Sequence, residues 1–312
     1  MGHAMTDAVT GAAPGAAGGG RDPVVLDVVR RGALTTVQDL GRGGYAHLGV
    51  PRSGALDLPA HRLANRLVGN PASAATLETT VSGCGLRPSR PVVVAVTGAA
   101  CGVRVDGRPA AWGAPVRVPA GALLDVGAAV GGLRSYVAVA GGIDAAPVLG
   151  SRSTDLLSGL GPGPLADGDV LPVGGERGAS RCVDALPYPG RGPELVLPLA
   201  PGPRDDWFAP EAFRTLVTGV YTVSPASNRI GLRTLGPALG RARGGELPSE
   251  GMVLGAVQVP PDGRPVVFLN DHPTTGGYPV IGVVPEGSLP AAAQSPPGTR
   301  ICFVLVRPTR LM

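Results

Sequence analysis

Short apolar runs separated by glycine and proline recur along the whole chain. Residues 91–99, 135–142, 265–271 and 300–308 are apolar on both alternating faces, a pattern typical of strands buried on two sides. In 194–202, leucine instead occupies every second position at the start of the run, which predicts a strand with one buried face. The pattern therefore predicts a β-rich protein whose strands form closed barrels or stacked sheets.

Two Asp-Gly pairs mark expected turns between extended segments. Asp106-Gly107 follows the alternating VRV, and Asp262-Gly263 follows VQVPP. Asp-Gly favours the positive φ angles that two-residue hairpin turns require. We therefore expect a reversal of the chain at each pair.

Two segments carry helical periodicity. We expect one helix over 58–68, with Asp57 as its N-cap, and a second over 209–218. In the first helix the apolar positions recur at i, i+3, i+4 and i+7, and they are Ala60, Leu63, Ala64, Leu67 and Val68. This register places four polar side chains off the apolar stripe, namely His61, Arg62, Asn65 and Arg66.

The composition indicates a compact, loop-rich protein rather than a disordered one. The chain has 50 glycines and 34 prolines among 312 residues, yet 44% of its residues are apolar. We predict a mainly β fold of two barrel-type halves with a few short helices, the first half over 23–180 and the second over 181–312. Residues 1–22 are expected to be a flexible tail, and the polar segment 174–194 a linker between the halves.

The absence of lysine limits the chemistry of the chain. All 27 basic residues are arginine, so the chain can supply neither a phosphate-binding lysine, nor a Schiff base, nor a biotinyl-lysine. If ATP bound in a P-loop or covalent biotin takes part in the reaction, another chain must provide that site. The net charge is only +4 and the arginines are scattered, which does not favour nucleic-acid binding.

Other features of composition bear on the location of the protein. No run of 18 apolar residues suggests a membrane span, and the N-terminal segment has no apolar core of a signal peptide. The four cysteines form no CxxC pair, so reduced thiols in the cytoplasm are expected.

Standard catalytic motifs are missing from the sequence. Neither G-x-S-x-G nor HExxH occurs, and four scattered histidines predict no metal site. The segment 41–46 fits G-x-G-x-x-A, but it does not open a helix within a βαβ unit, so a dinucleotide site is not favoured.

Two blocks gather the polar residues that remain as candidates. The first, 35–71, is a glycine-rich loop that leads into the first predicted helix and contains Asp39, Arg42, Tyr45, His47, Arg52, Ser53 and Asp57. Ser53 and Asp57 lie near a helix N-terminus, which favours an anionic ligand. In the alternative, Asp57 only caps the helix and Asp39 only organises the loop. The second block, 249–282, contains the sequence NDHPTTGGYP.

These blocks, together with 138–161, 201–208 and 223–239, resemble the allophanate hydrolase subunit 2 family. The V-P-x-S-G and T-T-G-G-Y-P stretches are its most specific parts, and the resemblance runs over about 24–308. The family includes a subunit of bacterial 5-oxoprolinase, the KipA protein and part of the carboxyltransferase region of urea carboxylase. It implies cyclophilin-like β-barrels for both halves.

The resemblance implies a heteromeric, ATP-dependent 5-oxoprolinase, in which this chain acts with a PxpB/KipI-like subunit and a PxpA-like subunit. ATP is then used by the complex and not by a P-loop on this chain. One alternative is a component of a biotin-dependent carboxyltransferase that acts on urea-like amides, with biotin supplied by a partner. A second alternative is a KipA-like regulatory binding subunit without activity.

Both enzymatic functions require donors near a developing oxyanion and an acceptor near the amide nitrogen. We interpret Asp271 as the acceptor or base, His272 as a group that titrates near neutral pH, and the Gly276-Gly277 backbone as the oxyanion donor. The predicted catalytic residues are Asp271, His272, Thr275 and Tyr278. The predicted binding residues are Asn270, Thr274, Gly276, Gly277, Ser53, Asp57, Arg62, Asn65 and Glu250. In the alternative, the second block is a structural β-turn.

The second block departs from its relatives at two positions. Relatives commonly carry lysine after T-T-G-G-Y-P, where this chain has Val280. Relatives usually have a small apolar residue where this chain has Asn270. Both departures lie beside the predicted site.

Overall fold

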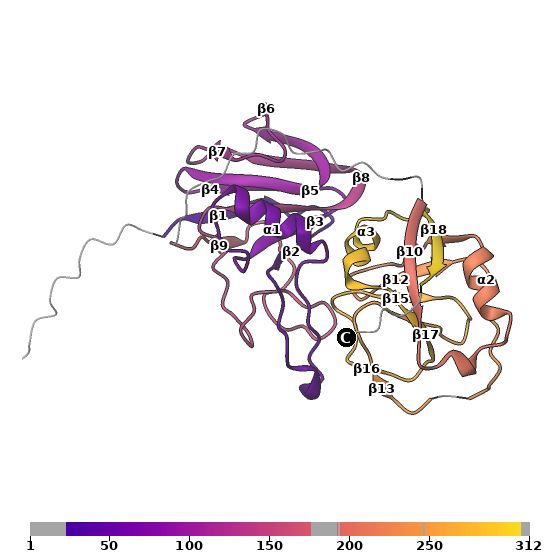
Figure 1. The fold of residues 1–312 in the computed structure, drawn as a ribbon. Coiled ribbons are helices and arrows are strands. Elements are labelled where there is room, and N and C mark those ends of the chain that lie inside the picture. Colours follow the sequence, from indigo (N-terminus) through magenta and orange to yellow (C-terminus); the bar gives the residue numbers. More distant parts are fainter. Residues whose placement is uncertain (1–22, 176–191, 193, 246, 307–312) are drawn as a thin grey trace, which may run out of the picture.

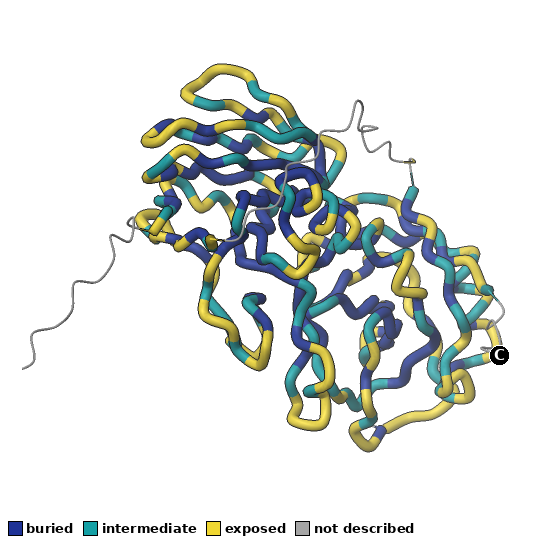
Figure 2. Tube along the Cα trace, turned by 60° about the vertical axis from the view of Figure 1, so that its left-hand side comes forward, coloured by how far each residue is buried: buried dark blue, intermediate teal, exposed yellow. Residues whose placement is uncertain are grey.

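The computed structural model describes residues 23–175, 192, 194–245 and 247–306. The predicted tail over 1–22 and most of the predicted linker over 174–194 therefore lie outside the described residues, as does the predicted boundary between 180 and 181. The described residues form two β-rich halves side by side (Figure 1). In Figure 2 the buried positions gather inside each half and where the two halves meet.

The first half is a curled nine-stranded sheet with the order β2-β3-β8-β4-β1-β9, in which β5 pairs with β6, β7 and β8. Two long strands, β5 and β8, pair over most of their length and form its centre. Its strands are β1 (Val25–Arg30), β2 (Leu34–Gln38), β3 (Thr76–Thr80), β4 (Cys84–Pro88), β5 (Val92–Val105), β6 (Arg108–Ala110), β7 (Val116–Val118), β8 (Leu124–Val139) and β9 (Val170–Pro172).

The Asp-Gly turn expected in the first half is present. Asp106 and Gly107 connect β5 to β6 with φ angles of 46° and 76°, as a type I′ hairpin requires. In the second half, Gly263 also has a positive φ, 74°, but the loop there spans 259–265, between the antiparallel strands β14 (Ala256–Gln258) and β15 (Val266–Phe268).

Helix α1 (Leu58–Leu67) packs against β5 and β8. The expected cap is confirmed, because the Asp57 side chain accepts a hydrogen bond from the Ala60 N–H. Ala64 and Leu67 are buried against Ala138 of β8. Within this sheet-facing cluster the apolar stripe is as predicted.

The second half is a closed barrel with the order β10-β17-β14-β15-β12-β11-β18. Strands β10 and β18 close it as a parallel pair. Beside β14 and β15 its strands are β10 (Glu194–Pro201), β11 (Tyr221–Val223), β12 (Gly231–Leu235), β17 (Val280–Val283) and β18 (Arg300–Leu305). A separate two-stranded arm pairs β13 (Glu250–Gly251) with β16 (Thr275–Gly276).

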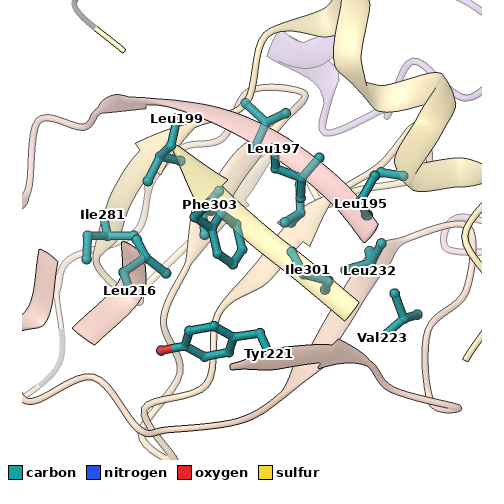
Figure 3. Close-up of a cluster of buried hydrophobic side chains, with 14 of the residues drawn as sticks. Leu195, Leu197, Leu199, Leu216, Tyr221, Val223, Leu232, Ile281, Ile301 and Phe303 are labelled. Atoms are coloured by element: carbon teal, nitrogen blue, oxygen red, sulfur yellow. The ribbon is translucent and has the colours of Figure 1, made fainter. Parts of the chain in front are cut away.

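The barrel is filled by inward-facing apolar side chains. Leu195, Leu197 and Leu199 of β10 point inward together with Phe303 of β18 (Figure 3), as the alternation in 194–202 predicts. The Tyr221 ring meets the Phe303 ring edge-on, with centroids 5.8 Å apart. Leu56, which precedes α1, belongs to the same cluster, so the first half contributes to the core of the second.

Short helices complete the second half. Helix α2 (Ala212–Thr218) starts later than predicted, and α3 (Leu289–Ala293) was not predicted because five residues are too few to establish a helical period. Two single-turn helices of this half are η2 (Asp205–Trp207) and η3 (Glu286–Ser288), and a third, η1 (Ala46–Leu48), lies in the first half. None of the described helices is long and apolar enough to cross a membrane.

The prediction of a mainly β protein with two barrel-type halves is confirmed. Only the second half closes fully, while the first remains a curled sheet with edge strands.

Candidate functional site

A buried ion pair lies where the two halves meet. Arg229 donates from Nε and Nη2 to the two oxygens of Asp271, at 2.9 Å each. Both side chains have no exposed surface. The Leu156 N–H and the Ser53 hydroxyl also lie within hydrogen-bond distance of the carboxylate, at 3.2 and 3.0 Å. Both carboxylate oxygens of Asp271 therefore have hydrogen-bond partners, and the group is enclosed by protein.

Glu78 of β3 receives the other end of the same guanidinium. Arg229 Nη1 donates to Glu78 Oε1, while the Leu56 N–H and the Tyr136 hydroxyl donate to Oε2, at 3.0 and 2.7 Å. Burial alone would raise the pKa of Glu78, but the charges of Arg229 and Arg134 hold this pKa below its ordinary value. The network thus ties the sheet of the first half to the barrel through charged groups.

The backbone around Ser53 is pinned to the barrel beside this ion pair. Ser53 has a φ of 54°, a left-handed conformation that a residue other than glycine adopts at a cost. The Ser53 N–H donates to the Asn270 carbonyl at 2.9 Å, and the Asn270 amide donates to the Ala55 carbonyl at 3.0 Å. The two sequence blocks therefore meet, as the prediction of a shared site requires.

A pocket of about 360 Å³ opens next to this contact. Its walls are mostly apolar and come from both halves, and its residues are Leu40, Arg52, Ala55, Leu56, Leu58, Pro59, Arg62, Leu254, Asn270, Glu286, Gly287, Leu289 and Pro290. We call it the junction pocket. Its size falls within the range of about 300–1,000 Å³ that is common for small-molecule sites.

Few polar groups reach the junction pocket. Arg62 is exposed on α1 and has no hydrogen-bond or ion-pair partner among the described residues. The Asn270 amide nitrogen is engaged with backbone carbonyls, and its amide oxygen has no partner within the same part of the chain. At the rim, Arg52 and Glu286 form an ion pair of 3.0 Å. A free cation and a free acceptor on apolar walls suit a small anion that carries an N–H group.

The T-T-G-G-Y-P stretch lies apart from the junction pocket, on the two-stranded arm (Figure 1). Thr275 is exposed, and the Thr274 carbonyl accepts from the Met252 N–H at 2.8 Å. A Cβ on Gly276 would come within 2.7 Å of Gln258 Nε2, so a larger residue here would displace the end of the Gln258 side chain. The Arg241 guanidinium lies over the Tyr278 ring, with its Cζ atom 6.0 Å from the ring centroid.

Glu250 of the arm pairs with Arg204, the residue before η2. Arg204 donates to both of its carboxylate oxygens. This hydrogen bonding lowers the pKa of Glu250, so the group is ionised and engaged. The arm residues thus stand together at the surface, but none of them lines the junction pocket.

His272 does not have the environment expected of a group that titrates near neutral pH. Its ring is buried, stacks on Phe268 with centroids 5.8 Å apart, and bonds the Pro273 carbonyl through Nδ1 at 2.7 Å. Burial lowers the pKa of His272 below its ordinary value, because the imidazolium would lose its hydration. The expectation of a near-neutral titration is therefore corrected to a neutral, packed histidine.

Asn65 is also placed differently from the prediction. It is fully buried, donates to the Ala74 carbonyl at 2.8 Å and accepts from the Asn70 amide at 3.0 Å. His61, one turn earlier, is buried against Thr76 and the Ala72 carbonyl. His61 and Asn65 thus face a neighbouring loop rather than a ligand. Periodicity alone could not show this, because the loop reaches the helix only in the folded chain.

Asp57 lines a second cavity, of about 590 Å³, on the other side of α3. It receives a hydrogen bond of 2.9 Å from Gln294 Nε2 in addition to its capping role. Gln294 also accepts from the Leu133 and Arg134 N–H groups. Asp57 therefore connects α1 and α3 across the two halves.

The surroundings of Val280 suit an apolar residue where relatives commonly carry lysine. It is 7% exposed and packs with Met252, Ala256, Val266 and Phe268 in a small apolar cluster. A side chain at this position points into the protein beside the arm, so an apolar residue is well accommodated.

Sequence reasoning did not assign roles to Arg229, Glu78 or Gln294. Arg229 follows Ser227 and Asn228, Glu78 lies among threonines, and Gln294 precedes Ser295, so none of the three forms a motif of its own. The partners of their side chains described above lie 22 to 237 residues away in sequence. Among the described residues no group of His, Cys, Asp and Glu could hold a metal ion.

The fold and the junction pocket define a two-part β protein with a pocket of small-molecule size between its halves. A family model described as carboxyltransferase domain, subdomain A and B, matches residues 48–305, and the chain belongs to this family. The family resemblance predicted from the sequence is thereby confirmed.

Relatives of known identity include enzyme subunits and parts of larger enzymes. The chain is 40% identical to a 5-oxoprolinase subunit of Escherichia coli, over 90% of this chain and 91% of that protein. It is 34% identical to urea amidolyase of Saccharomyces cerevisiae over 91% of this chain, but spans only 17% of that enzyme.

Solved structures agree with these relationships. TTHA0988 superimposes with a TM-score of 0.82 at 40% identity, over 92% of this chain and 57% of that chain. Urea carboxylase of Kluyveromyces lactis gives 0.83 at 32% identity, over 93% of this chain and 28% of that chain. The chain thus spans little more than half of TTHA0988 and a smaller part of the multidomain enzymes.

Proposed function

We propose that this chain is a subunit of a 5-oxoprolinase and that it holds the lactam substrate in the junction pocket. The observation that carries the proposal is that the Arg62 guanidinium and the Asn270 amide oxygen both face the mostly apolar junction pocket. Neither group has a partner among the described residues. The high identity to the Escherichia coli 5-oxoprolinase subunit, along almost the full length of both chains, supports it.

The substrate fits the chemistry of the pocket. 5-Oxoproline is a five-membered lactam with a carboxylate, an N–H and an apolar ring edge. Arg62 pairs with the carboxylate, Asn270 Oδ1 accepts from the lactam N–H, and Leu56 and Leu289 contact the ring. In hydrolysis, water adds to the lactam carbonyl carbon and the C–N bond breaks, which yields the second carboxylate and the free amine of glutamate.

The chain requires partners for the remaining chemistry. The residues of the junction pocket include no lysine, cysteine, serine or threonine, and Glu286 is already paired with Arg52. We therefore place ATP use on the complex, with a PxpB/KipI-like subunit and a PxpA-like subunit acting beside this chain in the cytoplasm. In this arrangement the chain binds and orients the lactam while a partner supplies the phosphate-handling groups.

The test is a comparison of Arg62→Ala with Arg66→Ala in the reconstituted complex. Arg66 lies one turn further along the same helix, is exposed, and does not line the pocket. We expect Arg62→Ala to raise the KM for 5-oxoproline at least about tenfold, because one charge-assisted contact to the carboxylate is lost, and Arg66→Ala to leave it unchanged. Glutamate release and ATP hydrolysis are the measurements. Equal KM values for the two variants would contradict the proposal.

A second candidate function is carboxyl transfer to a urea-like amide. The family model and the urea amidolyase relatives favour it. Urea has no carboxylate, however, so a free arginine in the pocket would have no partner on the substrate. Biotin would have to arrive on another chain, since this chain has no lysine. Binding of a biotinylated carrier, with turnover of urea but not of 5-oxoproline, would favour this function instead.

A further inference from the structure

A loop over 42–52 extends from the first half as a compact unit with a narrow base. It is seen in Figure 1 as the indigo segment that descends away from the sheet. At the base, the Arg42 N–H donates to the Arg52 carbonyl at 2.7 Å. A Cβ on Gly41 would lie 2.5 Å from the Arg52 carbonyl oxygen, and one on Gly54 would lie 2.8 Å from the Gly41 nitrogen. Such closed surface loops are frequently functional.

The base of this loop is held by two buried charged side chains, Arg42 and Asp39. Arg42 has a fully buried side chain that donates to the Ser153 and Val148 carbonyls. Asp39 accepts from the Ser151 and Ser153 hydroxyls, at 2.6 Å each. Burial alone would raise the pKa of Asp39, but these hydrogen bonds and those from backbone N–H groups hold it below its ordinary value. The loop is therefore fixed in position.

The tip of the loop buries nothing of its own. The single-turn helix η1 has no buried residue, and Leu48 is 61% exposed. Tyr45 and Val50 beside it are half-buried. The stretch 43–50, GGYAHLGV, contains no acidic or basic residue apart from His47. A tip without acidic residues, lysine or arginine and with an exposed leucine is a surface suited to an apolar groove on another protein, and not to nucleic acid or an anionic membrane.

The position of the loop relates this surface to the junction pocket. Leu40, just before the loop, and Arg52, at its end, both line the pocket. The base of the loop therefore forms part of the pocket wall, and a protein that covers the loop from tip to base would border the pocket. The pocket residues lack the groups needed for the remaining chemistry, so a second chain in this place is what the proposed function requires.

The relatives indicate which protein occupies this surface. The chain accounts for 57% of TTHA0988, so that chain contains a second part that has no counterpart in the matched region. We propose that the tip of the 42–52 loop, with Leu48 at its centre, docks into an apolar groove of a separate protein homologous to that second part, and so brings it to the mouth of the junction pocket. The biological role of this docking contact rests on the proposed function, whereas the binding experiment that tests the contact does not.

The experiment measures binding between the full chain and the purified homologue of the second part of TTHA0988 from the same organism, by calorimetry and by co-elution. Leu48→Asp and Tyr45→Ala are compared with Val220→Asp. Val220 is 56% exposed and lies between α2 and β11, and α2 lies on the side of the barrel away from the first half (Figure 1). We expect Leu48→Asp to weaken binding at least about tenfold, since a charge would enter an apolar contact, with Val220→Asp unchanged.

Other outcomes have defined meanings. Wild-type affinity in Leu48→Asp, in a chain with an unchanged unfolding temperature, would overturn the proposal. Loss of self-association in Leu48→Asp, without a change in partner binding, would show that a second copy of this chain occupies the tip, and would also overturn it. A chain with Arg62→Ala should still bind the partner normally, so failure of the pocket assignment and failure of the docking surface can be distinguished.

Discussion

At the scale of single residues, Asp271 shows how burial changes the role of a candidate group. A base must reach substrate, but the Asp271 carboxylate is enclosed by Arg229, Ser53 and the Leu156 N–H. The structure thus favours a stabilising role for Asp271, and its predicted action on substrate stays a prediction. Asn270, one residue earlier, is the member of the block that reaches the junction pocket.

We expect Asp271→Asn to lower the free energy of unfolding by about 3 kcal/mol, since removing one partner of a buried ion pair leaves the other charge poorly compensated. Chemical denaturation at neutral pH measures this. Asp262→Asn, in an exposed turn, is the matched control and should change stability by less than about 0.5 kcal/mol. If Asp271→Asn unfolded like the wild type but lost turnover, the carboxylate would act on substrate after all.

At the scale of elements, α1 is held on two sides by different interactions. Ala64 and Leu67 pack on the sheet, while His61 and Asn65 bond the loop at 72–74. Only Arg62 and Arg66 remain exposed on its polar side. The helix therefore presents Arg62 to the junction pocket from a fixed position.

The buried His61 makes the attachment of α1 dependent on pH. Burial lowers the pKa of His61 below its ordinary value of 6.5, so the unfolded chain binds the proton more readily than the folded one. The free energy of unfolding should therefore fall as the pH drops from about 6.5 toward the folded pKa. His61→Gln, compared by denaturation across this range, should be less stable at pH 7.5 and show a shallower slope. A slope equal to that of the wild type would assign the acid sensitivity to His272 or to another group.

At the scale of the whole molecule, the two halves are joined by a contact that is buried and charged. Arg229 of the barrel bonds Glu78 of the first sheet, and Gln294 bonds the backbone of β8. Leu56 of the first half adds to the barrel core. The walls of the junction pocket come from both halves, so its shape depends on these contacts.

We expect Arg229→Gln to separate the unfolding of the two halves. The wild type should give one calorimetric transition, because neither half can unfold alone without breaking the buried Arg229–Glu78 pair between them. The variant leaves both carboxylates without their common cation, so two transitions or a broadened one should result. Arg233→Gln, at an exposed position of β12, is the control. A single sharp transition in Arg229→Gln would show that apolar contacts alone couple the halves.

Much of the architecture could be predicted because its signals are local. Apolar runs marked the central strands, Asp106-Gly107 marked a hairpin, and Asp57 marked the start of α1. Helix α3 was missed because it is a single short turn that forms against its surroundings. The family was predicted from its sequence blocks and is confirmed by the match over 48–305.

The sequence by itself determined the β-rich class, the position of α1 and the family. Only the tertiary structure decided which polar residues meet. Ser53 and Asp271 are 218 residues apart in sequence and 3.0 Å apart in space, and no local pattern encodes that distance. Burial, which follows from such long-range contacts, sets whether a carboxylate pairs with arginine or faces a ligand. It placed Asp271 in the first group, and it left Arg62 and Asn270 facing the junction pocket.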